Sequence, residues 1–218
     1  MDVHAQARSM LFNRGSVQFG SFKLKLHEKT PAAPLSPFFF NLRTRNNPKP
    51  GPLLSKDCEL IATCIWKEIL SSRIPFTAIC GIPNAGTPIV QALERVVAKP
   101  RGFRVIPLTK VMTDAGRRIV PAPGFAYRQG ERVFLIDDLI TKADTKFESI
   151  TSLGEQGCIV AGLAVLIDRE QGGVQELQKR GYAVVSAFST IQLFCEYHRE
   201  GKIDQPKLDE CIDYIRNN

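Results

Sequence analysis

Apolar and polar residues follow two patterns along the chain, and together they predict strands that alternate with helices. Predominantly apolar segments, which predict strands, occupy 77–81, 103–107, 133–136, 158–167 and 183–188, and the run 133–136 is apolar throughout, as in strands buried on both faces of a sheet. Between and after these runs, apolar residues recur at the spacing of amphipathic helices, as over 55–69, where Ser55 is the expected N-cap. The alternation predicts an α/β fold: a parallel sheet flanked by helices, with right-handed crossovers.

The first third of the chain has a different pattern. Apolar and polar residues alternate from Val17 to Lys25, which predicts a strand or one arm of a hairpin. A Pro-rich passage at 30–37 then interrupts the pattern. We therefore expect residues 1–54 to form a small N-terminal hood packed on a core of residues 55–218, the two making one compact unit.

The segment 132–146 combines a buried strand with acidic and hydroxyl side chains. Its apolar run, 133–136, leads into Asp137 and Asp138, which we place at the carboxyl end of the strand, where open α/β sheets hold their ligands. A polar turn then reaches a predicted helix start at Asp144, where free backbone N–H groups and the helix dipole favour an anion. The whole pattern indicates a phosphate site. The acidic pair alone would suit a solvated helix-capping turn better.

Composition places the chain among ordinary globular proteins. Its 218 residues are enough for one ample domain, and 44% of them are hydrophobic. The six cysteines form no close pair of the metal-binding kind, so they indicate buried thiols in a reducing compartment. The first residues lack the apolar core of a signal peptide, and no apolar run approaches the ~18 residues that a bilayer span requires. We expect a cytoplasmic protein without a membrane partner.

The net charge of +7 is concentrated near the N-terminus. Residues 1–50 hold eight Lys or Arg against two Asp or Glu, which accounts for +6 of the total. Such a bias suits an anionic ligand or a nucleic acid. The segment has no aromatic interleaving and no nucleic-acid motif, so a solvated basic surface is the better interpretation and we expect no nucleic-acid partner.

Five segments, in order and spacing, resemble the orotate phosphoribosyltransferases, a family of type I phosphoribosyltransferases. The resemblance covers nearly the whole chain, and the segment after residue 167 is especially similar to the orotate domain of UMP synthases. It implies a type I phosphoribosyltransferase-like α/β fold. The segments are Phe19–Lys25, Ser36–Asn41, Gly81–Gly86, Asp137–Asp138 and Ile167–Gly173.

The resemblance also implies an activity and a set of site residues. The reaction is transfer of the 5-phosphoribosyl group from phosphoribosyl pyrophosphate (PRPP) to N1 of orotate, giving orotidine 5′-phosphate and pyrophosphate with Mg²⁺, in a homodimer. The implied catalytic residues are Lys110, Asp137 and Asp138, and the last two would hold Mg²⁺ through water. The implied PRPP contacts are these three with Lys25, Arg117, Thr141, Lys142, Ala143, Asp144 and Thr145. The implied orotate contacts are Phe39, Phe40, Thr141 and Arg169.

The sequence departs from the family most clearly in the segment 109–130, which is polar, basic and long enough to indicate a lid or hairpin. Where the family carries Arg, Lys and His or Tyr, this chain has Thr109, Thr113 and Ala115. Two alternatives therefore stay open. One is a non-catalytic protein that binds a nucleotide or PRPP in a regulatory or subunit role. The other is transfer to a different base, against which Arg169 argues because it favours a carboxylated one.

Overall fold

The computed structural model describes residues 2–28, 30–97, 102–114 and 116–217. Within these ranges the core is a five-stranded sheet of order β4-β3-β7-β8-β9, in which every neighbouring pair is parallel. This confirms the predicted parallel α/β sheet. The strands are β3 (Ala78–Gly81), β4 (Arg104–Val105), β7 (Arg132–Ile140), β8 (Ile159–Asp168) and β9 (Val184–Ser189).

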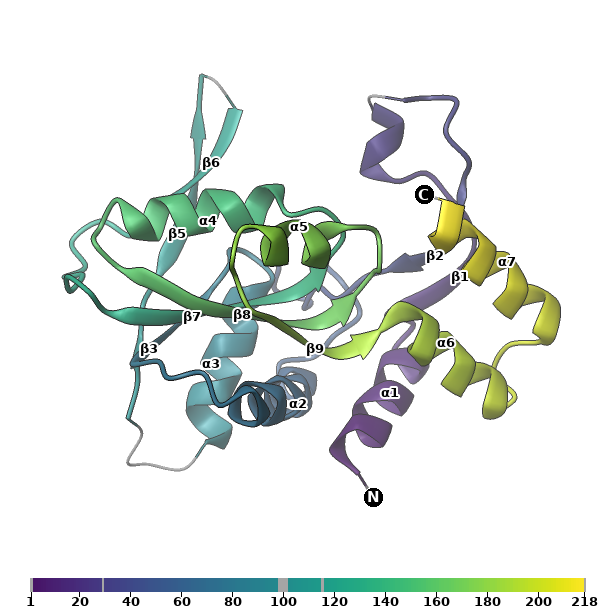
Figure 1. The fold of residues 1–218 in the computed structure, drawn as a ribbon. Coiled ribbons are helices and arrows are strands. Elements are labelled where there is room, and N and C mark those ends of the chain that lie inside the picture. The colour runs from purple at the N-terminus through teal and green to yellow at the C-terminus, as the bar shows by residue number, and fades with distance from the viewer. Residues whose placement is uncertain (1, 29, 98–101, 115, 218) are drawn as a thin grey trace.

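Helices cover both faces of this sheet (Figure 1). The pair α2 and α3 packs on one face, and the pair α4 and α5 on the other, so the strands are buried as their continuous apolar runs require. The predicted N-cap at Ser55 is wrong: the helix begins two residues later, and the Asp57 carboxylate accepts the Leu54 N–H at 2.8 Å. The four helices are α2 (Asp57–Ser72), α3 (Gly86–Val96), α4 (Asp144–Gly154) and α5 (Gly173–Lys179).

The N-terminal elements form a small layer beside one end of the sheet (Figure 1). Strands β1 and β2 pair antiparallel, which confirms the predicted hairpin arm. The C-terminal helices pack on this layer: the Phe38 ring lies 4.9 Å from that of Phe194 and 5.9 Å from that of Tyr214. The hood boundary at residue 54 stays a prediction. The elements are α1 (Val3–Asn13), β1 (Val17–Phe22), η1 (Lys25–Glu28), β2 (Ser36–Phe40), α6 (Thr190–Arg199) and α7 (Gln205–Asn217).

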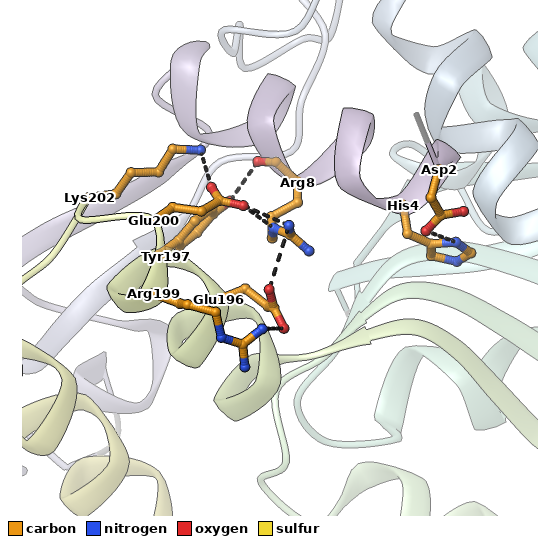
Figure 2. Close-up of polar contacts among 8 residues, drawn as sticks. All are labelled: Asp2, His4, Arg8, Glu196, Tyr197, Arg199, Glu200 and Lys202. Atoms are coloured by element: carbon orange, nitrogen blue, oxygen red, sulfur yellow. Dashed lines mark hydrogen bonds and ion pairs between the residues drawn. The ribbon is translucent and has the colours of Figure 1, made fainter.

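Polar contacts fasten the first helix to α6, as Figure 2 shows. The Arg8 guanidinium donates to the Glu200 carboxylate at 2.6 Å, and Lys202 lies 2.7 Å from the other oxygen of that carboxylate. The Tyr197 hydroxyl donates to the backbone carbonyl of Arg8 at 2.9 Å. Residues nearly 190 positions apart are therefore joined at one surface, which ties the N-terminal helix to the C-terminal part of the chain.

A second hairpin extends from the α4 side of the sheet (Figure 1). It consists of β5 (Leu108–Thr113) and β6 (Gly116–Pro121), paired antiparallel, so the segment expected to be a lid or hairpin is a hairpin. The Ile119 N–H donates to the Glu148 carboxylate of α4 at 2.6 Å, which fixes the base of the hairpin on that helix. Ala115 lies outside the described residues.

The start of α3 lies unusually close to the central strand. A Cβ atom added to Gly86 would meet the Ile136 carbonyl oxygen at 2.2 Å, and one added to Gly81 would meet the Gly86 carbonyl oxygen at 2.6 Å. Only glycine allows this approach. It brings the turn at 82–86 beside the end of β7, where the acidic pair lies.

The cysteines and the apolar character of the helices bear on the cellular compartment of the protein. All six cysteines are free, and five of them are buried, as the sequence predicted. A reducing, cytoplasmic location stays a prediction. Among the described residues, no helix combines the length and apolar character that crossing a bilayer requires.

Candidate active site

The site is built at the carboxyl end of β7, where the strand continues through the acidic pair to Ile140. This agrees with the predicted placement of Asp137 and Asp138 at the carboxyl end of the strand, and pairing with β8 continues from Asp137 to Ile140. Asp137 is only 7% exposed, and both of its carboxylate oxygens are engaged. One accepts the Asp138 N–H at 2.9 Å, and the other accepts from the Lys146 ammonium at 2.7 Å.

Asp138 has a more open environment. It is half-buried, and one carboxylate oxygen accepts the Leu139 N–H at 2.8 Å. Within the described residues, no N–H or O–H group donates to its other oxygen. Burial, followed by the negative charge of Asp137, raises the pKa of the Asp138 carboxyl well above its ordinary value, while Lys146 acts in the opposite direction. A second negative charge beside Asp137 is therefore unfavourable unless a further cation lies close to Asp138.

The turn between β7 and α4 presents backbone donors. In the described structure, no hydrogen bond uses the N–H groups of Asp144, Thr145 or Lys146, the first residues of α4. Ala143 is fully buried at φ −91°, an ordinary conformation that does not require glycine. Thr141 and Thr145 are half-buried, whereas Lys142 and Asp144 are exposed at the rim. An anion at this turn would meet free N–H groups and a favourable helix dipole.

The segment 168–173 is joined to this turn through its backbone. The Arg169 N–H donates to the Ile140 carbonyl at 2.9 Å, and the Gly173 N–H donates to the Thr141 carbonyl at 3.0 Å. A Cβ atom on Gly173 would lie 2.8 Å from that same Thr141 oxygen, so glycine is needed for the contact. The sequence-predicted orotate and phosphate residues are thus neighbours in space.

The Arg169 side chain is buried, with 6% of the residue exposed, and stands over aromatic rings. Its guanidinium carbon lies 5.0 Å from the centroid of the Phe38 ring and 5.8 Å from that of Phe40. Its Nε and Nη2 atoms are buried and have no hydrogen-bond partner among the described residues. Burial lowers the pKa of Arg169 to about 10, so the side chain remains charged at neutral pH. Of the predicted aromatic contacts, Phe40 is buried and Phe39 half-buried.

Lys110 on β5 faces the same region. Burial and the charge of Arg117 lower the pKa of its ammonium, while the charges of Asp137, Asp138 and Glu148 counteract this shift. The lysine is therefore within electrostatic reach of the acidic pair, whereas Arg117 is exposed on β6. Lys110 also borders a cavity of about 460 Å³ that is lined by the turn residues Pro83 and Asn84 and by the loop at 44–48.

One predicted residue and two residues that were not predicted complete the description. The backbone of Lys25 begins η1, but its side chain lies outside the described part of the structure. Lys146 and Glu148 were not predicted, although the first contacts Asp137 and the second holds the hairpin. A signal for Lys146 exists: it lies three and seven positions before Ser149 and Leu153 on the buried face of α4.

The side chains at the site indicate which mode of metal binding it could support. Among the described residues, no group of three or more His, Cys, Asp and Glu side chains could enclose a metal ion. Mg²⁺ is commonly held by one or two carboxylates, several waters and substrate phosphates. Asp138, with one oxygen open, fits that mode of water-mediated binding.

Comparison with known proteins agrees with this geometry. No protein-family model matches the chain. It is 24% identical to bovine "Uridine 5'-monophosphate synthase" over 211 residues, 95% of this chain but only 40% of that protein's length. It is 30% identical to an Acinetobacter baumannii "Orotate phosphoribosyltransferase" over 207 residues, covering 90% of this chain and 88% of the relative. The crystal structure of the Francisella tularensis orotate phosphoribosyltransferase superposes with a TM-score of 0.72 at 20% identity, covering 100% of this chain and 97% of that one.

The parallel sheet, the acidic end of its central strand and the turn into α4 define a type I phosphoribosyltransferase fold. The similarity to the Acinetobacter protein extends over nearly the full length of both chains. The chain belongs to the orotate phosphoribosyltransferase family of transferases.

Proposed function

We propose that this chain catalyses the Mg²⁺-dependent transfer of the 5-phosphoribosyl group from PRPP to N1 of orotate, with release of pyrophosphate. The products would be orotidine 5′-phosphate and pyrophosphate, as pyrimidine nucleotide biosynthesis requires. The reported relatives bear the names of enzymes of this reaction, and nothing among them favours the non-catalytic alternative.

The observation that carries the proposal is the unpartnered guanidinium of Arg169. A buried charge is costly unless hydrogen bonds and a counter-charge compensate it, and here two buried nitrogen atoms have no hydrogen-bond partner among the described residues. A planar carboxylate is the natural complement of such a fork, because two parallel N–H···O bonds satisfy both groups. Orotate carries that carboxylate next to a flat ring, which suits a guanidinium flanked by Phe38 and Phe40.

The phosphoribosyl half of the substrate would occupy the turn beside Arg169. Free N–H groups at the start of α4 would donate hydrogen bonds to the 5′-phosphate, with Thr141 and Thr145 supplying hydroxyls. Asp138, next to the engaged Asp137, would hold the ribose hydroxyls. The backbone contacts between 140–141 and 169–173 would keep the ring nitrogen of the base and the anomeric carbon close together, which is the main contribution that positioning makes to such a reaction.

The leaving group would be met by cations. When bound, Mg²⁺ would neutralise charge on the departing pyrophosphate. Lys110 would add a protein cation from the hairpin, and Arg117 lies on the opposing strand of the same hairpin. Asp138 would orient the waters of the ion. This arrangement needs no protein nucleophile, because the family reaction passes through a cation-like anomeric carbon.

The direct test follows the ultraviolet absorbance of orotate with PRPP and Mg²⁺. We expect loss of absorbance that depends on PRPP. In Asp138→Asn the rate of orotate consumption should fall by at least about 100-fold, because an active-site charge contact is removed. A folded protein that binds both ligands but gives no product would support the non-catalytic alternative instead. Faster use of uracil than of orotate would contradict the role given to Arg169. The homodimer and the cytoplasmic location stay predictions.

A further inference from the structure

Lys146 is a buried cation that the proposed reaction does not use. It lies in the first turn of α4, with 6% of its side chain exposed. Lysine is rarely buried unless its ammonium is paired, because removing the charge from water is expensive. Its two acceptors are both at the end of β7: the Asp137 carboxylate and the Leu139 carbonyl, each at 2.7 Å.

Because of these contacts, Asp137 and Asp138 have different environments. Each oxygen of Asp137 already accepts one hydrogen bond, from Lys146 or from the Asp138 N–H, and the residue is only 7% exposed, so little of its carboxylate is accessible to a ligand. Asp138 keeps an oxygen to which no described residue donates, on a half-buried side chain. Two neighbouring carboxylates repel each other, and the ammonium beside Asp137 reduces that repulsion.

We propose that Lys146 is the built-in counter-ion of Asp137 and that this pair leaves Asp138 alone to contact the ribose hydroxyls and the waters of Mg²⁺. Lys146 is thus a positioning residue: it acts through Asp137, whose carboxylate in turn fixes the backbone N–H of Asp138. This inference rests on the proposed function and refines it, because the sequence assigned ligand contacts to both acidic residues.

Under this proposal the negative charge of Asp137 serves to compensate the Lys146 ammonium, and it does not contact the ligand. Removing either partner leaves a buried, uncompensated charge, which harms the site. Removing both charges together, in the double variant Lys146→Met/Asp137→Asn, leaves none. The asparagine still offers an oxygen to the Asp138 N–H, and methionine occupies a volume similar to that of the lysine stem.

The experiment measures PRPP binding by calorimetry in the presence of Mg²⁺, together with thermal unfolding and the KM and kcat for both substrates. We expect each single variant to bind PRPP about tenfold or more weakly than the unmutated chain, as contacting residues commonly couple this strongly. The double variant should bind within about tenfold of the unmutated chain and more tightly than either single variant. Asp138→Asn should lose binding in every background.

A matched control lies at the other end of the same strand. Glu131 precedes β7 and forms an ion pair with Arg104 at 2.7 Å. Glu131→Gln breaks a second pair with a buried carboxylate, so it should lower the melting temperature and leave KM for PRPP unchanged. This separates a general loss of stability from an effect on the site.

Two results would overturn the proposal. A double variant that binds PRPP no better than Asp137→Asn would show that the Asp137 carboxylate itself contacts the ligand. A Lys146→Met variant with unmutated binding and melting would show that the ion pair has no role. If a single variant does not fold, PRPP binding by the double variant, compared with that by the unmutated chain, still tests the proposal. Failure of the proposed function would look different, because the unmutated chain itself would then consume no orotate.

Discussion

Arg169→Met should have opposite effects on stability and on function. The side chain is buried, and its Nε and Nη2 atoms have no partner among the described residues, so the ligand-free protein carries the cost of an incompletely compensated charge. Methionine has a similar length, no charge, and good contacts with aromatic rings such as Phe38. We expect the variant to be more stable than the unmutated chain and to bind orotate poorly.

The magnitude of both effects follows from the burial. The pKa of Arg169 falls from its ordinary 12.5 to about 10, and at ~1.4 kcal/mol for each pKa unit the charged form loses about 3 kcal/mol on folding. Cation–π contacts with Phe38 and Phe40 return part of this, about 1 to 2 kcal/mol, so a net gain of about 1 to 2 kcal/mol is expected in the variant. For a chain of this size that corresponds to a rise of ~2 to 8 °C in Tm.

The loss of function should be larger. Two charge-assisted hydrogen bonds to the orotate carboxylate, each worth about 1.5 to 3 kcal/mol, correspond to a loss of at least about 100-fold in kcat/KM for orotate. The sign of the stability change at neutral pH is fixed, because a base whose pKa is lowered on folding is destabilising while it stays charged, below its folded pKa of about 10. Its cost should therefore fade only as the pH rises through that value.

Calorimetric melting and orotate absorbance measure the two effects on the same protein. Arg180 is the matched control: its guanidinium lies 3.8 Å from the Phe147 ring centroid, but its side chain is 58% exposed. Arg180→Met should change Tm and orotate kinetics little. An Arg169→Met protein that melts at a lower temperature and keeps its KM for orotate would refute the reasoning, because the guanidinium would then be a satisfied structural group.

Two further predictions concern the scaffold. Gly86→Ala should destabilise by about 3 kcal/mol in urea unfolding, because its Cβ would lie 2.2 Å from the Ile136 oxygen, whereas Gly154→Ala, with open space around it, should be neutral. Glu200→Gln should cost about 0.2 to 1 kcal/mol at pH 7. Hydrogen bonds from Lys202 and then Arg8 lower the pKa of Glu200, so its contribution is complete above the ordinary value of 4.5 and is lost as the pH falls through the lowered pKa. A cost that did not change with pH would contradict this origin.

Much of the fold could be predicted because apolar periodicity reflects burial directly. The runs at 133–136 and 158–167 are apolar on both faces, and they form the two central strands of the sheet. Boundaries were less accurate for a physical reason. A strand can carry polar residues such as the two carboxylates of β7 while its backbone still pairs, so β7 continues to Ile140, beyond the point where its apolar run stops.

Candidate site residues could be predicted from the sequence where the residue type itself indicates the chemistry. They could not be predicted where the contact depends on how the chain folds. Asp138, Thr141 and Arg169 stand out as an acid, a hydroxyl and a guanidinium in recognisable segments, and the structure brings their backbones together. Lys146 does not stand out, because a lysine one turn into a helix normally points to solvent. Its burial depends on how α4 packs against β7, and only that packing places its ammonium 2.7 Å from Asp137.

Two buried cations at one sheet edge illustrate how such residues can be told apart. Lys146 has two short contacts to the protein, so its charge is already compensated and it stabilises the position of a neighbour. The Arg169 guanidinium lies against the Phe38 ring, and its Nε and Nη2 atoms have no partner among the described residues, so under the proposed function a bound anion would compensate its charge. Burial and charge are the same in both cases. What distinguishes the positioning residue from the binding residue is whether the protein itself satisfies the hydrogen-bond donors, and this is why exchanging Lys146 calls for a second, compensating change whereas exchanging Arg169 does not.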